Sequence, residues 1–235
     1  MVVELNLLIS LLKLSENGSV LIESVKRDAR IPADVTEKLL RNLQNQGLVY
    51  LKGDMVEADT FSRLKLAVKA VSLGGDVESV SSLLCWQEFE EIAALALRNN
   101  GYTVAKNVRF NHAGRKWEID VVGCKKPMVV CIDCKHYHHG MSPSAMQKIA
   151  EAQAQRTKAL ADTLPNVKIK LDCGSWNKAK FVPAILSLLP SRAKFYDEVP
   201  IVPVLQLQDF ISQLPAQVEV LAYFQKEFSH LRHDF

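Results

Sequence analysis

The sequence predicts an α/β protein in which a small helical domain with a two-stranded ribbon precedes a larger domain of helices packed on a mixed sheet. Three observations lead to this prediction. Apolar residues recur at helical spacing over the first 73 residues, a Gly- and Ser-containing connector follows, and the remainder alternates strand-like and helix-like segments. The chain has 235 residues, 48% of them hydrophobic, which is ample for a buried core.

The first domain is predicted to span residues 1–76. Its three helices and ribbon follow from apolar spacing, from Gly18 and Gly47 as helix ends, and from the turn Lys52-Gly53-Asp54. A fourth amphipathic helix is expected at 61–73. The first three helices are expected at 4–14, 20–30 and 34–46, and the two ribbon strands at 48–51 and 55–56.

This order of elements resembles a winged helix-turn-helix domain. In that family the third helix enters the major groove of DNA. The resemblance implies DNA contacts from Lys38, Arg41 and Asn42 on the third helix and from Lys52 at the tip of the wing. Winged helices also serve as protein-interaction modules, and the same residues fit an ordinary solvated face equally well.

The second domain, residues 77–235, is predicted to form a mixed sheet flanked by helices. A long helix ends before Gly101, strands follow on both sides of a turn at 125–127, and a polar helix comes next. Two apolar strands and a last helix complete the domain. The helices are expected at 86–99, 144–162 and 207–214, and the strands at 102–104, 108–110, 117–123, 128–137, 181–186 and 199–205.

Composition and charge narrow the classes of function. No apolar run approaches the roughly 20 residues of a membrane span, and Glu4 stands where a signal peptide would be positively charged. Five irregularly spaced cysteines do not form a disulfide framework, so we expect a reducing cytoplasm. Residues 1–76 hold 10 basic and 10 acidic residues, whereas residues 105–180 hold 14 and 6, a net charge of +8. A basic middle region surrounding a few acids indicates a phosphate-rich partner.

Two carboxylates and a lysine are the candidate catalytic group. If strand 117–123 alternates, Glu118 and Asp120 share one face, and Asp133 and Lys135 share a face of the next strand. A hairpin between these strands brings both aspartates to the same end of the sheet. Carboxylates in an apolar sheet are costly without a cation, and Mg²⁺ takes one or two protein carboxylates along with water.

These residues resemble the PD-(D/E)XK nuclease superfamily, in its Mrr-like restriction endonuclease and archaeal Holliday-junction resolvase branch. The matching motifs are W-Q-E-F-E at 86–90, G-Y at 101–102, E-I-D-V-V-G at 118–123 and I-D-C-K at 132–135. The resemblance implies that Asp120 and Asp133 bind Mg²⁺ or Mn²⁺, with the main-chain carbonyl of Cys134 as a further ligand, and that Lys135 is the catalytic lysine. Glu90 matches the first-helix glutamate, although Glu88 and Glu91 lie close by. Gln153 or Gln155 is a further candidate near the scissile phosphate.

The segment around Asp133 and Lys135 can also be interpreted in other ways. Cys131 and Cys134 spell C-x-x-C, which is typical of zinc or redox sites, and His136, His138 and His139 follow. In a strand, however, the two cysteines fall on opposite faces, which disfavours a shared zinc ion. Asp133 and Lys135 also fit a surface ion pair.

The sequence therefore predicts a metal-dependent DNA endonuclease that hydrolyses phosphodiester bonds in repair, recombination or restriction. The expected partner is DNA, and cutting both strands would favour a homodimer. Two alternatives remain: a DNA-binding or assembly protein with a catalytically idle nuclease fold, and a zinc-dependent transcription regulator.

Overall fold

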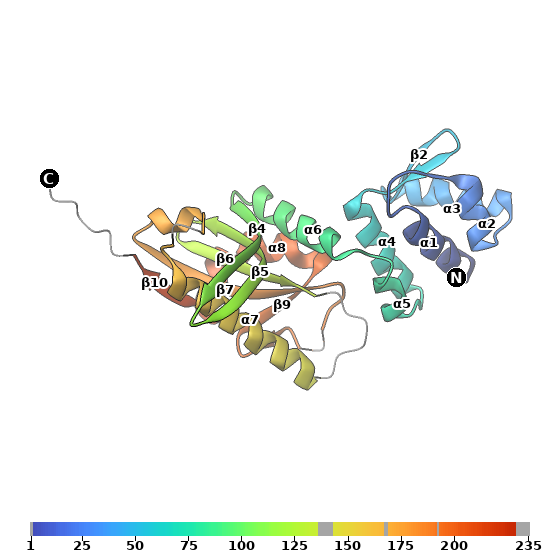
Figure 1. The fold of residues 1–235 in the computed structure, drawn as a ribbon. Helices are drawn as coiled ribbons and strands as arrows, with labels where there is room; N and C mark the ends of the chain where they lie inside the picture. The colour runs from blue at the N-terminus through green and yellow to red at the C-terminus, as the bar shows by residue number, and fades with distance from the viewer. Residues whose placement is uncertain (1, 136–142, 167–168, 192, 229–235) are drawn as a thin grey trace. The chain divides into compact units, whose positions relative to one another are not determined.

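The computed structural model of the protein describes residues 2–135, 143–166, 169–191 and 193–228 (Figure 1). The described residues form two compact units, one ending at Glu88 and the other beginning at Phe89. The domain boundary near residue 76 remains a prediction, because a division by internal contacts does not test which segment folds alone.

The first unit is built from helices around a small sheet of strand order β1-β3-β2. The prediction of a helix from residue 20 was wrong in its first two residues. Val20 and Leu21 form β1 and pair antiparallel with Val56 and Met55 of β3, partners that the local pattern does not reveal. The elements of the first unit are α1 (Val2–Leu14), β1 (Val20–Leu21), α2 (Ile22–Ala29), α3 (Ala33–Asn45), β2 (Tyr50–Lys52), β3 (Met55–Glu57), α4 (Thr60–Ser72) and α5 (Val77–Ser81). The winged-helix assignment stays a prediction.

The second unit is a mixed sheet of strand order β4-β5-β6-β7-β9-β8, with β10 also paired to β7. Strands β4, β5 and β6 are antiparallel neighbours, whereas β6, β7 and β9 are parallel. Strands β8 and β10 were not predicted from the sequence. Its elements are α6 (Trp86–Asn99), β4 (Thr103–His112), β5 (Arg115–Lys125), β6 (Met128–Cys134), α7 (Pro143–Thr163), β7 (Lys178–Ser187), β8 (Phe195–Tyr196), β9 (Val199–Pro203), α8 (Leu207–Gln217) and β10 (Phe224–Glu227).

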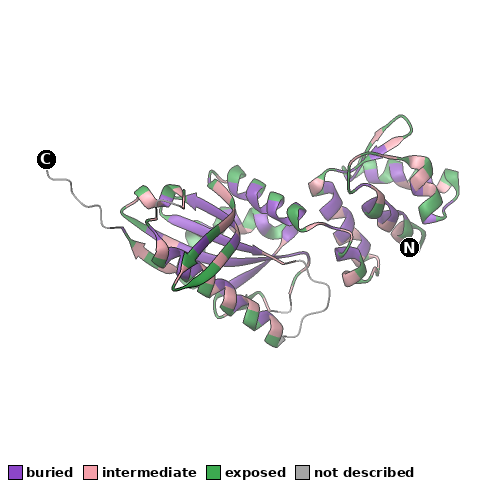
Figure 2. Cartoon of the chain, viewed as in Figure 1, coloured by how far each residue is buried: buried purple, intermediate pink, exposed green. Residues whose placement is uncertain are grey.

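Helices α6 and α7 cover opposite faces of this sheet (Figure 1). A Cβ atom at Gly123 of β5 would lie 2.7 Å from the side chain of Leu97 on α6, so glycine is needed for that close approach. On the other face, Leu160 of α7 shares a core cluster with Phe181 of β7. Strands β6 and β7 are therefore almost continuously buried, as Figure 2 shows. Asp133, the one acidic residue of β6, is therefore buried.

Strand β5 does not alternate strictly. Ile119 and Val122 belong to the same core cluster although they are three residues apart. The ladder between β4 and β5 omits the pair Asn107 and Asp120, and Asn107 has a left-handed backbone (φ 53°). The strict alternation expected for strand 117–123 was therefore wrong, because Ile119 and Val122 share the core face and the ladder is interrupted at Asp120 between them.

Part of the predicted site lies outside the described residues. Strand β6 was expected to continue to residue 137, but its described part ends at Cys134. His136, His138 and His139 lie in the segment that is not described. Among the described residues, no helix has both the length and the apolar character needed to cross a lipid bilayer.

Tyr102 offers a test of the core at the edge of the second unit. It is 4% exposed, and its hydroxyl group has no hydrogen-bond partner among the described residues. Burial raises the pKa of Tyr102 to about 12, above the value of about 10 in an unfolded chain. The folded state therefore keeps this proton at a pH where the unfolded state loses it, and stability falls as the pH rises through this window.

We expect Tyr102→Phe to leave the free energy of unfolding at pH 8 unchanged or raised by roughly 1 kcal/mol, because it removes an unsatisfied polar group. The advantage over the wild type should grow above about pH 10. Urea unfolding across this pH range measures it, with Tyr50→Phe at an exposed position as the control. A variant less stable than the wild type at pH 8 would show that the hydroxyl group has a partner.

Candidate active site

The hairpin of β5 and β6 brings the two predicted aspartates together. Val121 pairs with Ile132 at the end of the ladder, and Asp120 and Asp133 are the next residues of the two strands. Asp120 is tied to the neighbouring strand, since the backbone N–H of Cys134 donates a 2.7 Å hydrogen bond to Oδ2 of Asp120. The backbone of Lys135 is held in turn by donation to the carbonyl oxygen of Leu186 on β7. The main chain next to β6 therefore fixes the Asp120 carboxylate, and β7 fixes the backbone of Lys135.

Two cations flank the carboxylate of Asp133, which is only 3% exposed. The ammonium group of Lys135 lies 2.8 Å from Oδ2 and donates a 3.1 Å hydrogen bond to Oδ1. The guanidinium group of Arg156 on α7 contacts Oδ1 at 3.0 Å. The Lys135 contact to Oδ2 is an ion pair without hydrogen-bond geometry, so this buried oxygen accepts no hydrogen bond within the described part of the chain.

Arg156 was not predicted, and a fully buried glutamine helps to hold it. Gln153 donates from Nε2 to the carbonyl oxygen of Cys131 at 2.8 Å and accepts from Arg156 at 3.2 Å. Of the two glutamines considered from the sequence, Gln153 thus contacts this group of residues, whereas Gln155 is exposed. The only sequence signal for Arg156 is its position three residues after Gln153, on the same helical face.

The three glutamates at the start of α6 have different surroundings. Glu88 is buried against Arg63 of the first unit, and Glu91 is paired with Lys106 and Arg98. Glu90 is 2% exposed and has no cation within salt-bridge distance among the described residues. Burial raises the pKa of Glu90, and the charge of Asp120 raises it further. Of the three, Glu90 is the one whose environment is coupled to the aspartates.

Asn107 is a second residue that the sequence analysis missed. It stands across the hairpin from Asp120, where the ladder is interrupted, and its amide lies 3.5 Å from Oε2 of Glu90. Asparagine tolerates the left-handed backbone found here better than most other residues. The kink at Asn107 therefore turns an amide towards the acidic cluster.

The electrostatics of the site favour an added cation. Burial raises the pKa of the Asp120 carboxyl group, and the charge of Asp133 raises it further. The Cys134 N–H, Lys135 and Arg156 act in the opposite direction without cancelling that rise. A cation near Asp120 and Glu90 would offset both the burial and the mutual repulsion of these acids.

The donor set fits a hard divalent cation in part. No group of three or more His, Cys, Asp or Glu side chains is gathered in metal-binding geometry within the described ranges. Mg²⁺, however, needs only one or two carboxylates because it retains several water molecules. The two aspartates, and the Asp133 oxygen that accepts no hydrogen bond, supply ligands of this kind.

The cysteines of the C-x-x-C sequence have separate environments. Cys131 is fully buried in the core cluster, together with Cys124 and Cys173. Cys134 is half-buried beside the acids, and burial together with the charges of Asp120 and Asp133 raises the pKa of its thiol. The burial of Cys131 and the raised pKa of Cys134 both favour protonated thiols and disfavour thiolate ligands.

The predicted DNA contacts of the first unit lie on its surface. Lys38, Arg41 and Asn42 of α3 and Lys52 of β2 are all exposed. Arg41 forms an ion pair with Glu37 one turn earlier, and Asn42 accepts a hydrogen bond from Gln46. Their role in binding DNA stays a prediction.

Comparison with known proteins identifies the segment that contains the acids. Residues 82–163 match the family model Mrr_cat, described as restriction endonuclease. This segment includes Glu90, Asp120, Asp133, Lys135 and Arg156. This segment is therefore similar to a restriction endonuclease domain, which supports a nuclease-like function, and the predicted mixed sheet flanked by helices is confirmed. No match was found among curated proteins.

Solved structures show only distant similarity. A protein from Vibrio cholerae is 13% identical with a TM-score of 0.38, over 93% of this chain and 51% of that one. Can2 from Sulfobacillus thermosulfidooxidans, in complex with cyclic tetra-adenylate, is 13% identical with a TM-score of 0.33, over 92% and 50%. Restriction endonuclease FokI bound to DNA is 16% identical with a TM-score of 0.29, over 90% and 44%. The chain spans about half the length of these structures.

Proposed function

We propose that this protein is a metal-dependent deoxyribonuclease that hydrolyses phosphodiester bonds, and that it cuts within DNA strands. The observation that carries the proposal is the neighbouring pair of Asp120, partly buried, and Asp133, buried, with Lys135 against Asp133, inside a segment that matches a restriction endonuclease family model. Burial and the charge of Asp133 raise the pKa of Asp120, and ionisable groups perturbed in this way are typical of functional sites.

Each residue has a role that follows from its contacts. Asp120, Asp133 and the carbonyl oxygen of Cys134 would hold Mg²⁺ or Mn²⁺, and Glu90 would hold it directly or through water. The bound metal ion supplies Lewis acidity towards the scissile phosphate and an acidified water molecule. Lys135 neutralises charge that develops on the phosphate, or positions the attacking water.

The two residues that the sequence did not reveal support this group. Arg156 keeps Asp133 in place through its 3.0 Å contact and adds a second positive charge beside the site of phosphate binding. Asn107 orients Glu90 through its amide. Both are positioning residues in this proposal.

A panel of labelled DNA structures tests the function. Duplex, flapped, junction, methylated and closed circular DNA are incubated with the full chain, with and without Mg²⁺ or Mn²⁺. We expect metal-dependent cleavage of at least one substrate, and nicking or linearisation of the circle if cuts are internal. Absence of cleavage of every DNA structure with either metal ion would overturn the proposal.

An idle nuclease fold is the second candidate, and one observation favours it. The described residues do not gather three metal-binding side chains in one cluster. A protein of this kind would bind DNA in the same panel but leave every substrate intact. DNA binding with no metal-dependent cleavage would therefore support the alternative, whereas cleavage would exclude it.

Replacement of Cys134 separates a thiol role from a backbone role. We expect Cys134→Ala to retain most of the cleavage activity, because the proposed ligand is the main-chain carbonyl and the thiol is protonated. Cys131→Ala should also retain activity but cost roughly 1 kcal/mol or more of stability, since that side chain is fully buried. Cleavage assays and metal analysis measure this. Loss of activity together with release of zinc would instead favour the zinc interpretation.

We further propose that the first unit is a winged helix that binds DNA through α3 and Lys52, or binds a protein partner. A homodimer would allow cuts in both strands. The five free cysteines support a reducing cytoplasm as the location.

A further inference from the structure

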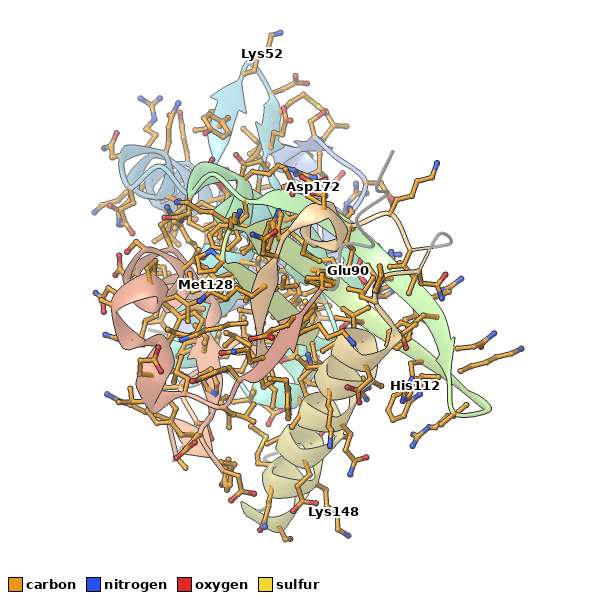
Figure 3. All side chains as sticks on the ribbon, turned by 90° about the vertical axis from the view of Figure 1, so that its left-hand side faces the viewer. Lys52, Glu90, His112, Met128, Lys148 and Asp172 are labelled. Atoms are coloured by element: carbon orange, nitrogen blue, oxygen red, sulfur yellow. The ribbon has the colours of Figure 1, made fainter. Side chains whose placement is uncertain are left out.

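The hairpin of β4 and β5 continues beyond the rest of the sheet as a two-stranded arm. Strand β5 pairs with β6 only from Val121 to Lys125, whereas it pairs with β4 as far as the turn between His112 and Arg115. We call residues 108–112 and 115–119 the distal arm. In Figure 3 His112 marks its tip, away from Glu90. The arm begins one residue beyond Asp120, so it starts at the acidic site.

The inner face of the distal arm is fixed. Phe110 lies in the core cluster, and Val108 and Trp117 pack against it. At the tip, Thr163 at the end of α7 lies 3.1 Å from the His112 ring, and the indole N–H of Trp117 donates to the carbonyl oxygen of His112. A two-stranded ribbon is marginally stable alone, so these contacts explain how the arm keeps its position.

The outer face of the distal arm is polar. Arg109 and Glu118 form a cross-strand ion pair at 3.1 Å, and Asn111 stands opposite Lys116. Both pairs are exposed, and they line a shallow surface depression together with their neighbours in sequence. This row of polar residues begins at the acidic site, because Asn107, two residues before Arg109, contacts Glu90.

Charge and shape both indicate a nucleic-acid duplex as the partner. The distal arm holds three cations, Arg109, Arg115 and Lys116, against one acid, Glu118, whereas residues 1–76 have no net charge. The guanidinium group of Arg115 is stacked on Trp117, 4.1 Å from the ring centroid, which keeps a positive charge at the tip. A two-stranded β-ribbon is one of the two elements that the major groove admits.

We propose that the distal arm lies along duplex DNA on one side of the cleaved bond, where Arg109 and Lys116 bind backbone phosphates. This inference rests on the proposed nuclease function. Lys116 is four residues from Asp120, about 14 Å along a strand, which corresponds to about four base pairs of duplex rise. The substrate must therefore remain double-stranded for about that length on the arm side of the cut.

Binding to a labelled duplex in Ca²⁺ at several salt concentrations tests the contacts. We expect the full chain carrying Arg109→Gln and Lys116→Gln to bind at least ten-fold more weakly, with a salt slope smaller by about two. Glu118→Gln should act oppositely and tighten binding several-fold, because it releases Arg109 and removes a negative charge. The matched control, Lys158→Gln with Lys178→Gln, removes two exposed cations elsewhere and should change affinity far less.

Truncated substrates test the length of duplex. Once the wild type's cut has been mapped, a duplex that ends just beyond it on either side is compared with the full-length duplex. We expect the wild type to show a raised KM when the arm side is missing, and the Arg109→Gln, Lys116→Gln variant to lose this discrimination.

The outcomes separate the inference from the function beneath it. If the wild type cleaves DNA but the arm variant binds like the control variant, the distal-arm inference is wrong and the nuclease proposal stands. Tighter binding of duplex RNA than of duplex DNA would also overturn the inference. If no DNA is cleaved by the wild type, the nuclease proposal fails, and the binding series alone decides whether the arm contacts a duplex.

Discussion

Replacing Asp120 by asparagine should abolish DNA cleavage while leaving the protein as stable as the wild type, or more stable, at neutral pH. Cleavage should fall by about a thousand-fold or more, because the substitution removes a proposed metal ligand. The fold should persist, because asparagine keeps an oxygen that can accept the Cys134 N–H. Cleavage assays in Mg²⁺ and urea unfolding of the metal-free protein provide the two measurements.

The pH dependence of this variant's stability has a definite sign. Burial and Asp133 raise the pKa of the Asp120 carboxyl group in the folded state. Its contribution to stability is therefore present below the unfolded pKa, about 3.9, and is lost as the pH rises through the folded value. Asparagine does not titrate, so the stability of Asp120→Asn relative to the wild type should increase from acidic to neutral pH.

An exposed aspartate provides the control for this comparison. Asp209→Asn on α8 removes the same charge from an exposed side chain outside the acidic cluster and should change neither cleavage nor the pH dependence. Full activity in Asp120→Asn would remove Asp120 from the catalytic group. A large loss of stability at neutral pH would instead show that the carboxylate has a structural role.

The sequence was sufficient for those parts of the site that depend on short-range order. A turn between two apolar strands is enough to place Asp120 beside Asp133, and Lys135 follows two residues later, just beyond the end of β6. The C-x-x-C spacing could be discounted for the same reason, since residues three apart in a strand point to opposite faces. Cys131 in the core and Cys134 at the site agree with this interpretation.

The missed residues depend on long-range packing. Arg156 reaches Asp133 across 23 positions, and the rotation of α7 that directs it there is set by burial of neighbours such as Gln153. Asn107 contributes through a left-handed kink that no periodic pattern contains. The expected strict alternation of side chains in β5 failed for the same reason. The kink at Asn107 interrupts the ladder opposite Asp120, and the alternation is broken there.

The different surroundings of Glu88 and Glu90 also depend on long-range packing. The ion pair of Glu88 leads to the second prediction, a large loss of stability when its partner is removed. Arg63 is 3% exposed and forms a 2.7 Å ion pair with Glu88. Arg63 donates three further hydrogen bonds, and Glu88 accepts one from the Cys85 N–H. The other acceptors of Arg63 are the carbonyl oxygens of Leu12 and Leu83 and the hydroxyl group of Ser15. Such a network is costly to break from one side only.

We expect Arg63→Met to lower the free energy of unfolding by about 3–5 kcal/mol, because it leaves the Glu88 carboxylate buried without a cation. Glu88→Gln should be destabilising for the converse reason. The double variant Arg63→Met, Glu88→Met should be more stable than Arg63→Met alone, since it removes both charges together. Arg41→Met, which breaks an exposed pair with Glu37, should cost less than about 1 kcal/mol.

Hydrogen exchange of amides in α1 and α4 of the full chain measures this loss in the unit concerned, and urea unfolding measures it in the whole protein. The decisive measurement is whether the double variant is more stable than Arg63→Met alone. Removing one partner of a buried ion pair is costly, whereas removing one partner of a surface pair costs little. If Arg63→Met is no more destabilising than Arg41→Met, the Glu88 carboxylate is solvated or protonated when Arg63 is absent. In that case Glu88 would again compete with Glu90 for the catalytic role.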